Sequence, residues 1–285
     1  MPEQAWRILI ISMPPPVVER LVQFLRDLGH EPVAVVSARQ ERRSSDDTAS
    51  DFRPGQMLEA LPSELPILYP ASKAELEPLF RVYEPDLALC WGYRWKIPVE
   101  ALEVPRLGSV NQHPGLLPRH RGPIPLSWAL REGDTEFGVT WHRMDADFDT
   151  GPILAQATVP IEDDDTTIER VGPKLLQAAF GLLPRVFERI AAGDPGDPQP
   201  TEGACYDPQF GADYATVDWS QPARAIHNQV RAWRVTFGSS SVPGPVAELG
   251  GDRSRLLETS LVELPDAERV EAGDGPLWIV EREPA

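Results

Sequence analysis

The sequence has few cysteines and no long apolar run. Its 285 residues include two cysteines, Cys90 and Cys205, whose separation matches no metal-binding or redox motif. No stretch approaches the roughly 18 apolar residues of a membrane span. The first apolar run (6–12) follows the acidic Glu3, which is typical of a buried strand rather than a signal peptide. We therefore expect a reduced, cytoplasmic protein without a metal site.

Positive charge is also scarce. The only lysines are Lys73, Lys96 and Lys174, and 44 Asp and Glu against 27 Lys and Arg give a formal net charge of −17. A protein that binds nucleic acid through its phosphates normally carries a basic face. The charge balance leaves room for a local basic patch, but it disfavours a partner as large as an RNA.

A glycine-rich phosphate loop is missing after the first predicted strand. The sequence there is "SMPPPV" (12–17). Prolines donate no N–H to a phosphate, so this turn is unsuited to NAD or a nucleoside triphosphate.

Buried strand patterns alternate with helix patterns in the first 200 residues. Apolar runs of strand length occur at 6–12, 31–37, 66–70, 85–92, 107–113, 136–144 and 151–161, and helix patterns at 14–30 and 72–83. A long apolar-periodic helix follows at 168–190, which Pro173 and Pro184 should bend or split. This order predicts an α/β fold with a Rossmann-like, mainly parallel sheet and flanking helices.

A Gly- and Pro-rich stretch (191–208) marks the predicted domain boundary. We expect a catalytic domain over 1–200 and a small, reduced C-terminal β-barrel-like domain over 205–285. The second domain contains one amphipathic segment (218–233) and three β-like segments. Residues 37–56 are polar and aperiodic, which indicates an exposed loop.

Candidate catalytic residues follow the fifth predicted strand. Asn111 and His113 share one face of an extended chain because side chains alternate with period two, and Asp149 ends a later acidic turn. A carboxamide can donate to a developing oxyanion, an imidazole can move a proton, and a carboxylate can orient the imidazole. The set suits acyl transfer through a tetrahedral intermediate. Taken singly, an Asn-x-His pair is also a common structural pair, and an acidic turn is commonly solvated.

Residues 111–156 resemble the signature of the formyltransferases that use 10-formyltetrahydrofolate. They are most similar to the methionyl-tRNA formyltransferase branch and its small-molecule relatives, which include sugar N-formyltransferases. The parts that match in order and spacing are Asn111–Pro118, Arg121–Gly122, Gly138–Thr140 and Asp149–Gly151. Residues 217–233 resemble the start of the family's C-terminal domain.

The resemblance implies a mechanism and a donor site. A primary amine would attack the formyl carbon of 10-formyltetrahydrofolate, Asn111 and His113 would stabilise the oxyanion, and Asp149 would position His113 and help to move the proton. The pterin would lie between the loop after the fourth strand and the acidic loop. The implied cofactor-binding residues are Trp91, Gly92, Tyr93, Arg94, Trp95, Met144, Asp145 and Asp147. Trp91 and Trp95 are equally consistent with packing in a core.

The acceptor is left open by the signature. Gly115 stands where the family usually has Ser, and the 37–56 loop lacks the Gly- and Lys-rich pattern of an arm that reaches over tRNA. Residues 205–285 hold seven Arg and no Lys against thirteen Asp and Glu. These departures favour a small amine, such as an amino sugar or a specialised-metabolite amine. The alternative is a methionyl-tRNA formyltransferase; a 10-formyltetrahydrofolate hydrolase and an inactive folate-binding protein are further hypotheses.

Overall fold

Backbone contacts divide the chain into two units. The computed structural model describes residues 5–12, 14–38, 59–93, 95–235 and 244–285. The first unit comprises Met1–His113, Val139–Ala157 and Ala179–Ala204, and the second comprises Pro114–Gly138, Thr158–Ala178 and Cys205–Ala285. Most of the predicted 37–56 loop lies outside the described residues, and the division into 1–200 and 205–285 stays a prediction. None of the helices that the structure describes is long and apolar enough to cross a membrane.

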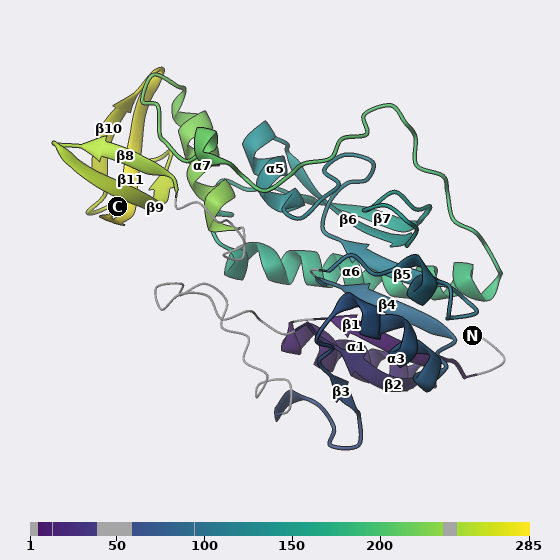
Figure 1. Ribbon diagram of the computed structural model, residues 1–285. Coiled ribbons are helices and arrows are strands. Elements are labelled where there is room, and N and C mark those ends of the chain that lie inside the picture. The colour runs from purple at the N-terminus through teal and green to yellow at the C-terminus, as the bar shows by residue number, and fades with distance from the viewer. Residues whose placement is uncertain (1–4, 13, 39–58, 94, 236–243) are drawn as a thin grey trace. The chain divides into compact units, whose positions relative to one another are not determined.

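A seven-stranded sheet confirms the predicted α/β class (Figure 1). Its strand order is β3-β2-β1-β4-β5-β6-β7. The strands are β1 Arg7–Ser12, β2 Glu31–Val36, β3 Ile67–Leu68, β4 Leu87–Trp91, β5 Ser109–His113, β6 Glu136–Arg143 and β7 Ile153–Pro160. The pairs from β3 to β5 are parallel, and β6 runs antiparallel to β5. The carboxyl ends of β1, β2, β4 and β5 therefore meet at one edge of the sheet.

Burial on both faces explains why the parallel strands are apolar throughout. Leu9 and Ile11 of β1 belong to a cluster that includes Leu76 and Phe80 of α3 (Leu76–Tyr83) and Leu102 of α4 (Val99–Leu102). The alternate β1 residues face the opposite side of the sheet because of the two-residue period. These are continuous apolar strands, as expected of a covered parallel sheet.

The long helix α6 (Ile168–Ala191) is continuous through both of its internal prolines. The helix is therefore not split at Pro173 or Pro184, and the alternative, a bend, stays a prediction. A proline inside a helix costs about 3 kcal/mol. Burial of one large apolar side chain returns about 1.5–3 kcal/mol, and α6 buries several: Val171, Leu175, Phe180, Leu183, Val186, Phe187 and Ile190.

A four-stranded antiparallel sheet, with order β10-β11-β9-β8, confirms the predicted C-terminal β domain. Its elements are β8 Val246–Leu249, β9 Asp252–Ser260, β10 Glu268–Ala272 and β11 Gly275–Pro284, preceded by η2 Ala212–Tyr214 and α7 Ala223–Arg234. Ile226 and Val230 of α7 pack against Leu256 of β9 and Leu277 of β11. Strand β10 was missed by the sequence pattern because its side chains are mostly exposed and charged. The same unit holds α5 (Pro125–Glu132).

Buried His227 of α7 makes the stability of this domain sensitive to acid. Its Nε2–H donates to the Asp163 carbonyl oxygen (3.1 Å), and its Nδ1 accepts from the Thr259 hydroxyl (3.0 Å). These two bonds suit a neutral ring. Burial, aided by the charge of Arg231, lowers the pKa of His227 to about 4.

We expect the free energy of unfolding to fall by up to roughly 3 kcal/mol as the pH drops from about 6.5 to about 4. In that window the unfolded chain binds a proton at His227 and the folded chain does not. Urea denaturation at several pH values should show this slope, and the slope should be shallower in His227→Gln. Parallel curves for the two proteins would contradict the assignment.

Gly138 of β6 is fixed by a close backbone approach. A Cβ placed there would lie 2.3 Å from the carbonyl carbon of Gly115, far inside contact distance. We expect Gly138→Ala to lower the free energy of unfolding by at least about 1–3 kcal/mol in chemical denaturation. The matched control is Gly181→Ala in α6, where an added Cβ meets nothing within 4 Å and the helix should gain up to about 1 kcal/mol. Equal effects of the two substitutions would refute this explanation.

Candidate active site

The register of three strands brings the predicted catalytic residues together. Asn111 of β5 lies opposite Cys90 of β4 on one side and His142 of β6 on the other. Asn111 is half-buried, whereas His113 and His142 are buried, at 3% and 1% exposure. Because β5 ends at His113, these side chains lie at the carboxyl edge of the parallel strands, where open α/β sheets bind ligands.

One carboxylate oxygen, Asp149 Oδ1, is the centre of the site. It lies 3.5 Å from Asn111 Nδ2, 3.5 Å from His113 Nδ1 and 3.5 Å from His142 Nε2. The Asp149 side chain is 11% exposed. The structure thus assembles Asn111, His113 and Asp149, which the sequence predicted as a set.

His142 is a fourth member of this cluster that the sequence analysis did not predict. Its Nδ1–H donates to the Arg143 carbonyl oxygen at 2.8 Å. In a neutral ring this leaves Nε2 as an acceptor, and Asn111 Nδ2 approaches it at 3.2 Å. His142 therefore orients the carboxamide of Asn111. The sequence signal is only a histidine on a strand, and the cross-strand register is what identifies it.

The turn that carries Asp149 depends on two neighbours. Asp149 has a left-handed backbone, with φ of 57°. Gly151 allows the backbone of Arg143 to pass closely, since a Cβ at residue 151 would overlap the Arg143 carbonyl oxygen. The side-chain amide of Gln199 donates to the carbonyl oxygens of both Asp149 and Gly151, each at 2.8 Å. Gln199 was also not predicted, because it lies 50 residues away in the linker.

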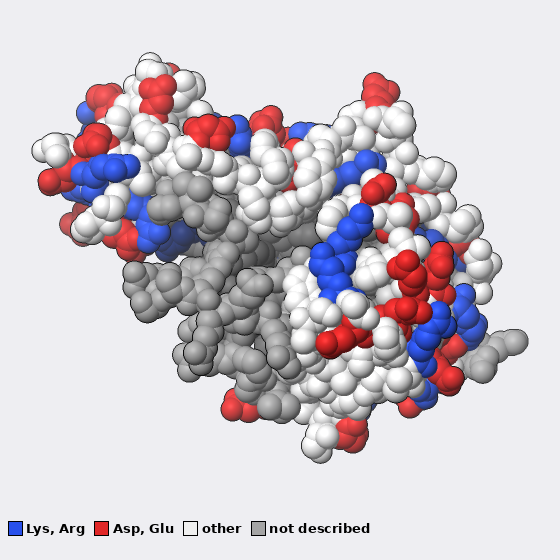
Figure 2. Space-filling view, in the orientation of Figure 1, with Lys and Arg blue, Asp and Glu red and all other residues white. Residues whose placement is uncertain are grey.

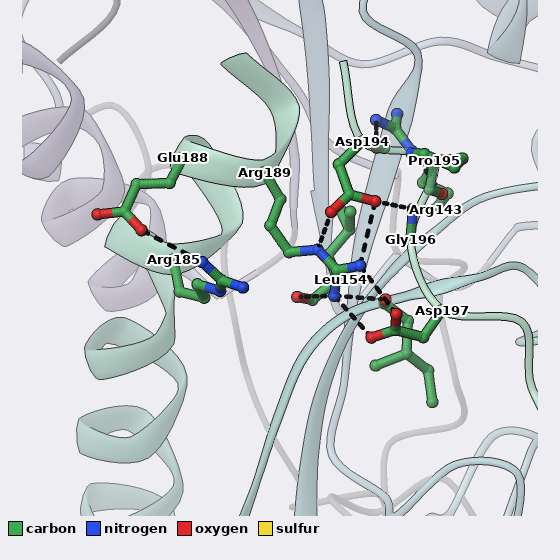
Figure 3. Close-up of polar contacts among 10 residues, drawn as sticks. Arg143, Leu154, Arg185, Glu188, Arg189, Asp194, Pro195, Gly196 and Asp197 are labelled. Atoms are coloured by element: carbon green, nitrogen blue, oxygen red, sulfur yellow. Dashed lines mark hydrogen bonds and ion pairs between the residues drawn. The ribbon is translucent and has the colours of Figure 1, made fainter. Parts of the chain in front are cut away.

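Two arginines fix the segment that leads to Gln199 (Figure 3). Arg189 of α6 contacts the carboxylates of Asp194 and Asp197, at 2.7 Å each, and a carbonyl oxygen of β7. Its guanidinium lowers the pKa of Asp194 to about 2. Arg143 donates to the carbonyl oxygens of Asp194 and Pro195. The guanidinium of Arg143 is thus hydrogen-bonded to backbone carbonyl oxygens, and these bonds fix its position next to His142.

The two loops predicted to hold the pterin meet in the structure. Tyr93 and Met144 pack against the same apolar cluster that covers one face of the sheet. Lys96 lies 3.7 Å from an Asp147 carboxylate oxygen and 5.5 Å from the centre of the Phe148 ring. The loop after β4 and the acidic loop after β6 therefore lie side by side.

The predicted contacts differ in what they can offer to a ligand. The Trp91 ring is in the core, between Trp141 and Phe180, at 5.4 and 5.3 Å between ring centres. It can therefore reach a ligand only through its backbone. Trp95 is half-buried and makes an edge contact with Tyr93. Gly92 has φ of 66°, a turn conformation that suits glycine.

Asp145 shapes the acidic loop from within. One oxygen of its carboxylate accepts from the backbone N–H of Asp147 (3.2 Å) and from the hydroxyl of Thr150 (2.6 Å). Asp147 itself is exposed. Arg94 lies outside the described residues. The binding roles of the eight donor-site residues remain predictions.

Burial perturbs two groups beside the site. Burial raises the pKa of the Cys90 thiol to about 12 and also raises the pKa of the Tyr93 hydroxyl. Both groups are therefore neutral near pH 7. Within the described residues the Tyr93 hydroxyl is buried without a hydrogen-bond partner, and a buried polar group of this kind calls for one. A polar ligand between the two loops would supply it, so the residues fit a folate at this position.

The fold and the site together define a group-transfer enzyme, and comparison with known proteins gives the family. A family model described as formyl transferase matches residues 6–187, and one described as formyl transferase, C-terminal domain, matches residues 211–284. The chain belongs to the formyl transferase family. The predicted enzyme class and the predicted donor, 10-formyltetrahydrofolate, are those of this family and are confirmed at that level.

Two curated relatives and one solved structure illustrate the similarity. Methionyl-tRNA formyltransferase from Trichlorobacter lovleyi is 32% identical over 260 residues, which is 90% of this chain and 79% of the relative. The enzyme of that name from Ruegeria pomeroyi is 32% identical over 281 residues, 93% of this chain and 87% of the relative. The N-formyltransferase from Helicobacter canadensis, solved with folinic acid and dTDP-3-aminofucose, is 16% identical, with a TM-score of 0.71 over 97% of this chain and 99% of that one. The last likeness supports the fold alone.

We expect Gln199→Leu to slow formyl transfer by roughly 10- to 100-fold, because small displacements of a catalytic group are costly. Loss of two hydrogen bonds would loosen the Asp149 turn while the sheet stays intact. The readout is kcat, with circular dichroism to check folding. The matched control is Gln23→Leu on α1 (Pro15–Asp27), an exposed glutamine whose side chain donates to Asp27. If the two variants had the same kcat, Gln199 would have no positioning role.

Proposed function

We propose that the protein transfers a formyl group from 10-formyltetrahydrofolate to a primary amine, with Asn111, His113 and Asp149 as its catalytic residues. The observation that supports this most strongly is the approach of Asn111 and His113 to Asp149 Oδ1 at the end of β5. A donor amide, an imidazole and a carboxylate are the groups that acyl transfer to an amine requires.

Asn111 has the role of oxyanion donor. One of its amide hydrogens is directed to His142 Nε2 at 3.2 Å, and the contact of its amide with Asp149 Oδ1 is long, at 3.5 Å. A long contact is weak. The formyl oxygen can therefore replace it as that oxygen gains negative charge, without disturbing the bond that orients the carboxamide.

Asp149 and His113 handle the proton of the attacking amine. Asp149 faces His113 Nδ1 at 3.5 Å, and the two side chains are 11% and 4% exposed. A carboxylate beside an imidazole favours its protonated form. The pair can thus accept a proton from the amine and stabilise the charged ring while the C–N bond forms.

The donor would be held by the loop after β4 and the acidic loop after β6. Backbone groups from Trp91 to Tyr93 are suited to the edge of the pterin, and Trp95 and Met144 to its faces. When bound, 10-formyltetrahydrofolate supplies the activated formyl group.

For the acceptor we give first place to the amino group of methionyl-tRNA. The relatives that align over most of both chains carry that name, and the C-terminal match over 211–284 extends the similarity beyond the catalytic residues. We therefore rank methionyl-tRNA, which charge alone disfavours, ahead of a small amine.

A small amine remains the second candidate because the basic groups of the C-terminal domain are already paired. Six of its seven arginines form ion pairs with carboxylates: Arg224, Arg234, Arg253, Arg255, Arg269 and Arg282. The seventh, Arg231, is 4% exposed. On the face shown in Figure 2, blue and red side chains are interspersed over the described residues. Binding to tRNA phosphates needs available Lys or Arg.

The test is formyl transfer from 10-formyltetrahydrofolate with two kinds of acceptor. Charged initiator methionyl-tRNA is compared with a panel of amino sugars and small amines, at low and at near-physiological salt. Asp149→Asn serves as the control for uncatalysed transfer. Saturable transfer to tRNA supports the first acceptor, and transfer to one small amine alone supports the second. Formate release without acceptor would indicate a hydrolase, and folate binding without any turnover would indicate a binding protein.

We expect Asn111→Ala to lower kcat by roughly 10²–10³-fold, the usual cost of one oxyanion donor. Affinity for the folate, measured by quenching of tryptophan fluorescence, should change little because Asn111 acts on the reacting oxygen. Asn111→Asp keeps the shape but replaces the donor amide by a carboxylate beside Asp149, so it should be at least as inactive. A kcat within about twofold of the parent protein in both variants would exclude the proposed role.

A further inference from the structure

A second cluster of polar side chains lies in the other unit, outside the catalytic residues. His120, Asp134, Cys205 and Asp207 come from three separate parts of the sequence. His120 and Asp207 are 3% and 9% exposed, and Cys205 is half-buried. One ring nitrogen of His120, Cys205 Sγ and an Asp207 oxygen all lie within 4.8 Å of one another. The formyl transfer mechanism does not use this cluster.

The backbone holds these side chains in place. The chain around Arg121 runs parallel to the chain around Tyr206. The Asp207 N–H donates to the Arg121 carbonyl oxygen (2.8 Å), and Gly122 permits the close approach, since a Cβ there would lie 2.5 Å from the Asp207 carbonyl oxygen. Cys205 and Asp207 are two residues apart on an extended segment, so they face the same side. That side faces His120.

Both ring nitrogens of His120 face carboxylate oxygens. Nδ1 lies 2.6 Å from Asp207 Oδ2, and Nε2 lies 3.0 Å from Asp134 Oδ2. An unprotonated ring nitrogen and a carboxylate oxygen are both acceptors, so a proton or a cation must lie between each pair. At Nε2 a proton suffices. At Nδ1 there is a third group: Cys205 Sγ lies 3.5 Å from Asp207 Oδ2. His120 Nδ1, Cys205 Sγ and Asp207 Oδ2 together offer one nitrogen, one sulfur and one oxygen ligand.

We propose that His120 Nδ1, Cys205 Sγ and the Asp207 carboxylate bind one divalent zinc ion, which cross-links the segment around His120 to the segment around Cys205. Zinc is the common biological metal that prefers His, Cys and Asp ligands together in a four-coordinate site. Water would be the fourth ligand.

The distances require little movement. With Zn–S of about 2.3 Å and Zn–O of about 2.0 Å, tetrahedral geometry places sulfur and oxygen about 3.5 Å apart, which is the observed separation of Cys205 Sγ and Asp207 Oδ2. With Zn–N of about 2.0 Å, nitrogen and oxygen lie about 3.3 Å apart. His120 Nδ1 and Asp207 Oδ2 would therefore separate by about 0.7 Å as the metal replaces the proton between them.

The surrounding groups are those that normally support a zinc ligand. The Asp134 carboxylate at Nε2 fixes the ring and leaves Nδ1 for the metal, and a carboxylate behind a metal-bound histidine is a common arrangement. Arg119 Nη2 holds the same carboxylate at 2.9 Å. The backbone N–H of His120 donates to Cys205 Sγ at 3.1 Å. Binding would release one proton from the thiol and one from Nδ1, so the charge of the cluster is unchanged when Zn²⁺ enters.

Cobalt(II) substitution tests the site directly. The full-length chain is freed of metal with EDTA and titrated with Co²⁺. We expect one Co²⁺ per chain, with visible d–d bands of a four-coordinate ion and a near-ultraviolet thiolate-to-cobalt band, both abolished by one equivalent of Zn²⁺. Cys205→Ser should lose the thiolate band, and the matched control Cys90→Ser should retain it. Asp134→Asn should weaken zinc affinity by roughly 10- to 100-fold.

A second measurement needs no variant. Cys90 is buried and Cys205 is half-buried, so a maleimide reagent should label Cys205 first, and Zn²⁺ should slow that labelling at least tenfold. Absence of the thiolate band in the parent protein, or its persistence in a folded Cys205→Ser protein, would overturn the proposal. Labelling of Cys205 at the same rate with and without Zn²⁺ would also overturn it.

Discussion

The geometry of the active site depends on one carboxylate oxygen, Asp149 Oδ1, which three side chains from two neighbouring strands approach at the same distance. A carboxylate in that position must be held by its own backbone, because its contacts with all three side chains are long. The left-handed turn at Asp149, the close passage at Gly151 and the two hydrogen bonds from Gln199 provide that support. The position of Asp149 therefore relies on Gln199, which lies 50 residues further along the chain.

The proposed reacting groups do not by themselves identify the acceptor. Asn111 and His113 lie at the end of a buried strand, where packing fixes them and neighbouring water is scarce. Such preorganised donors are most effective in a site of low dielectric constant. Because the reacting groups do not identify the acceptor, the same signature can serve in enzymes named for tRNA and in enzymes named for sugars.

Charge and similarity point to different acceptors, and the structure gives the reason for the conflict. The C-terminal arginines are paired with neighbouring carboxylates. The C-terminal domain therefore has a negative net charge of its own, as the whole chain does. The similarity to proteins named methionyl-tRNA formyltransferase extends over nearly the whole chain. It reflects the shared fold of both domains and not the charges on their surfaces. The cluster around His120 is a further feature of this chain. Its four side chains come from distant parts of the sequence, which is why the cysteine spacing predicted no metal site.

The sequence by itself determined the sheet, the C-terminal β domain and the three residues that we propose as catalytic. Apolar runs of strand length mark strands that are buried on both faces, and alternation placed Asn111 and His113 on one side. The tertiary structure decided the rest. His142 joins the site through cross-strand register and Gln199 through a long-range bond, and neither leaves a local pattern. The Trp91 ring packs in the core against Trp141 and Phe180. Helix α6 continues through its prolines because burial of its apolar face outweighs their local free-energy cost. A local sequence pattern cannot predict this, because it does not indicate which residues the helix packs against.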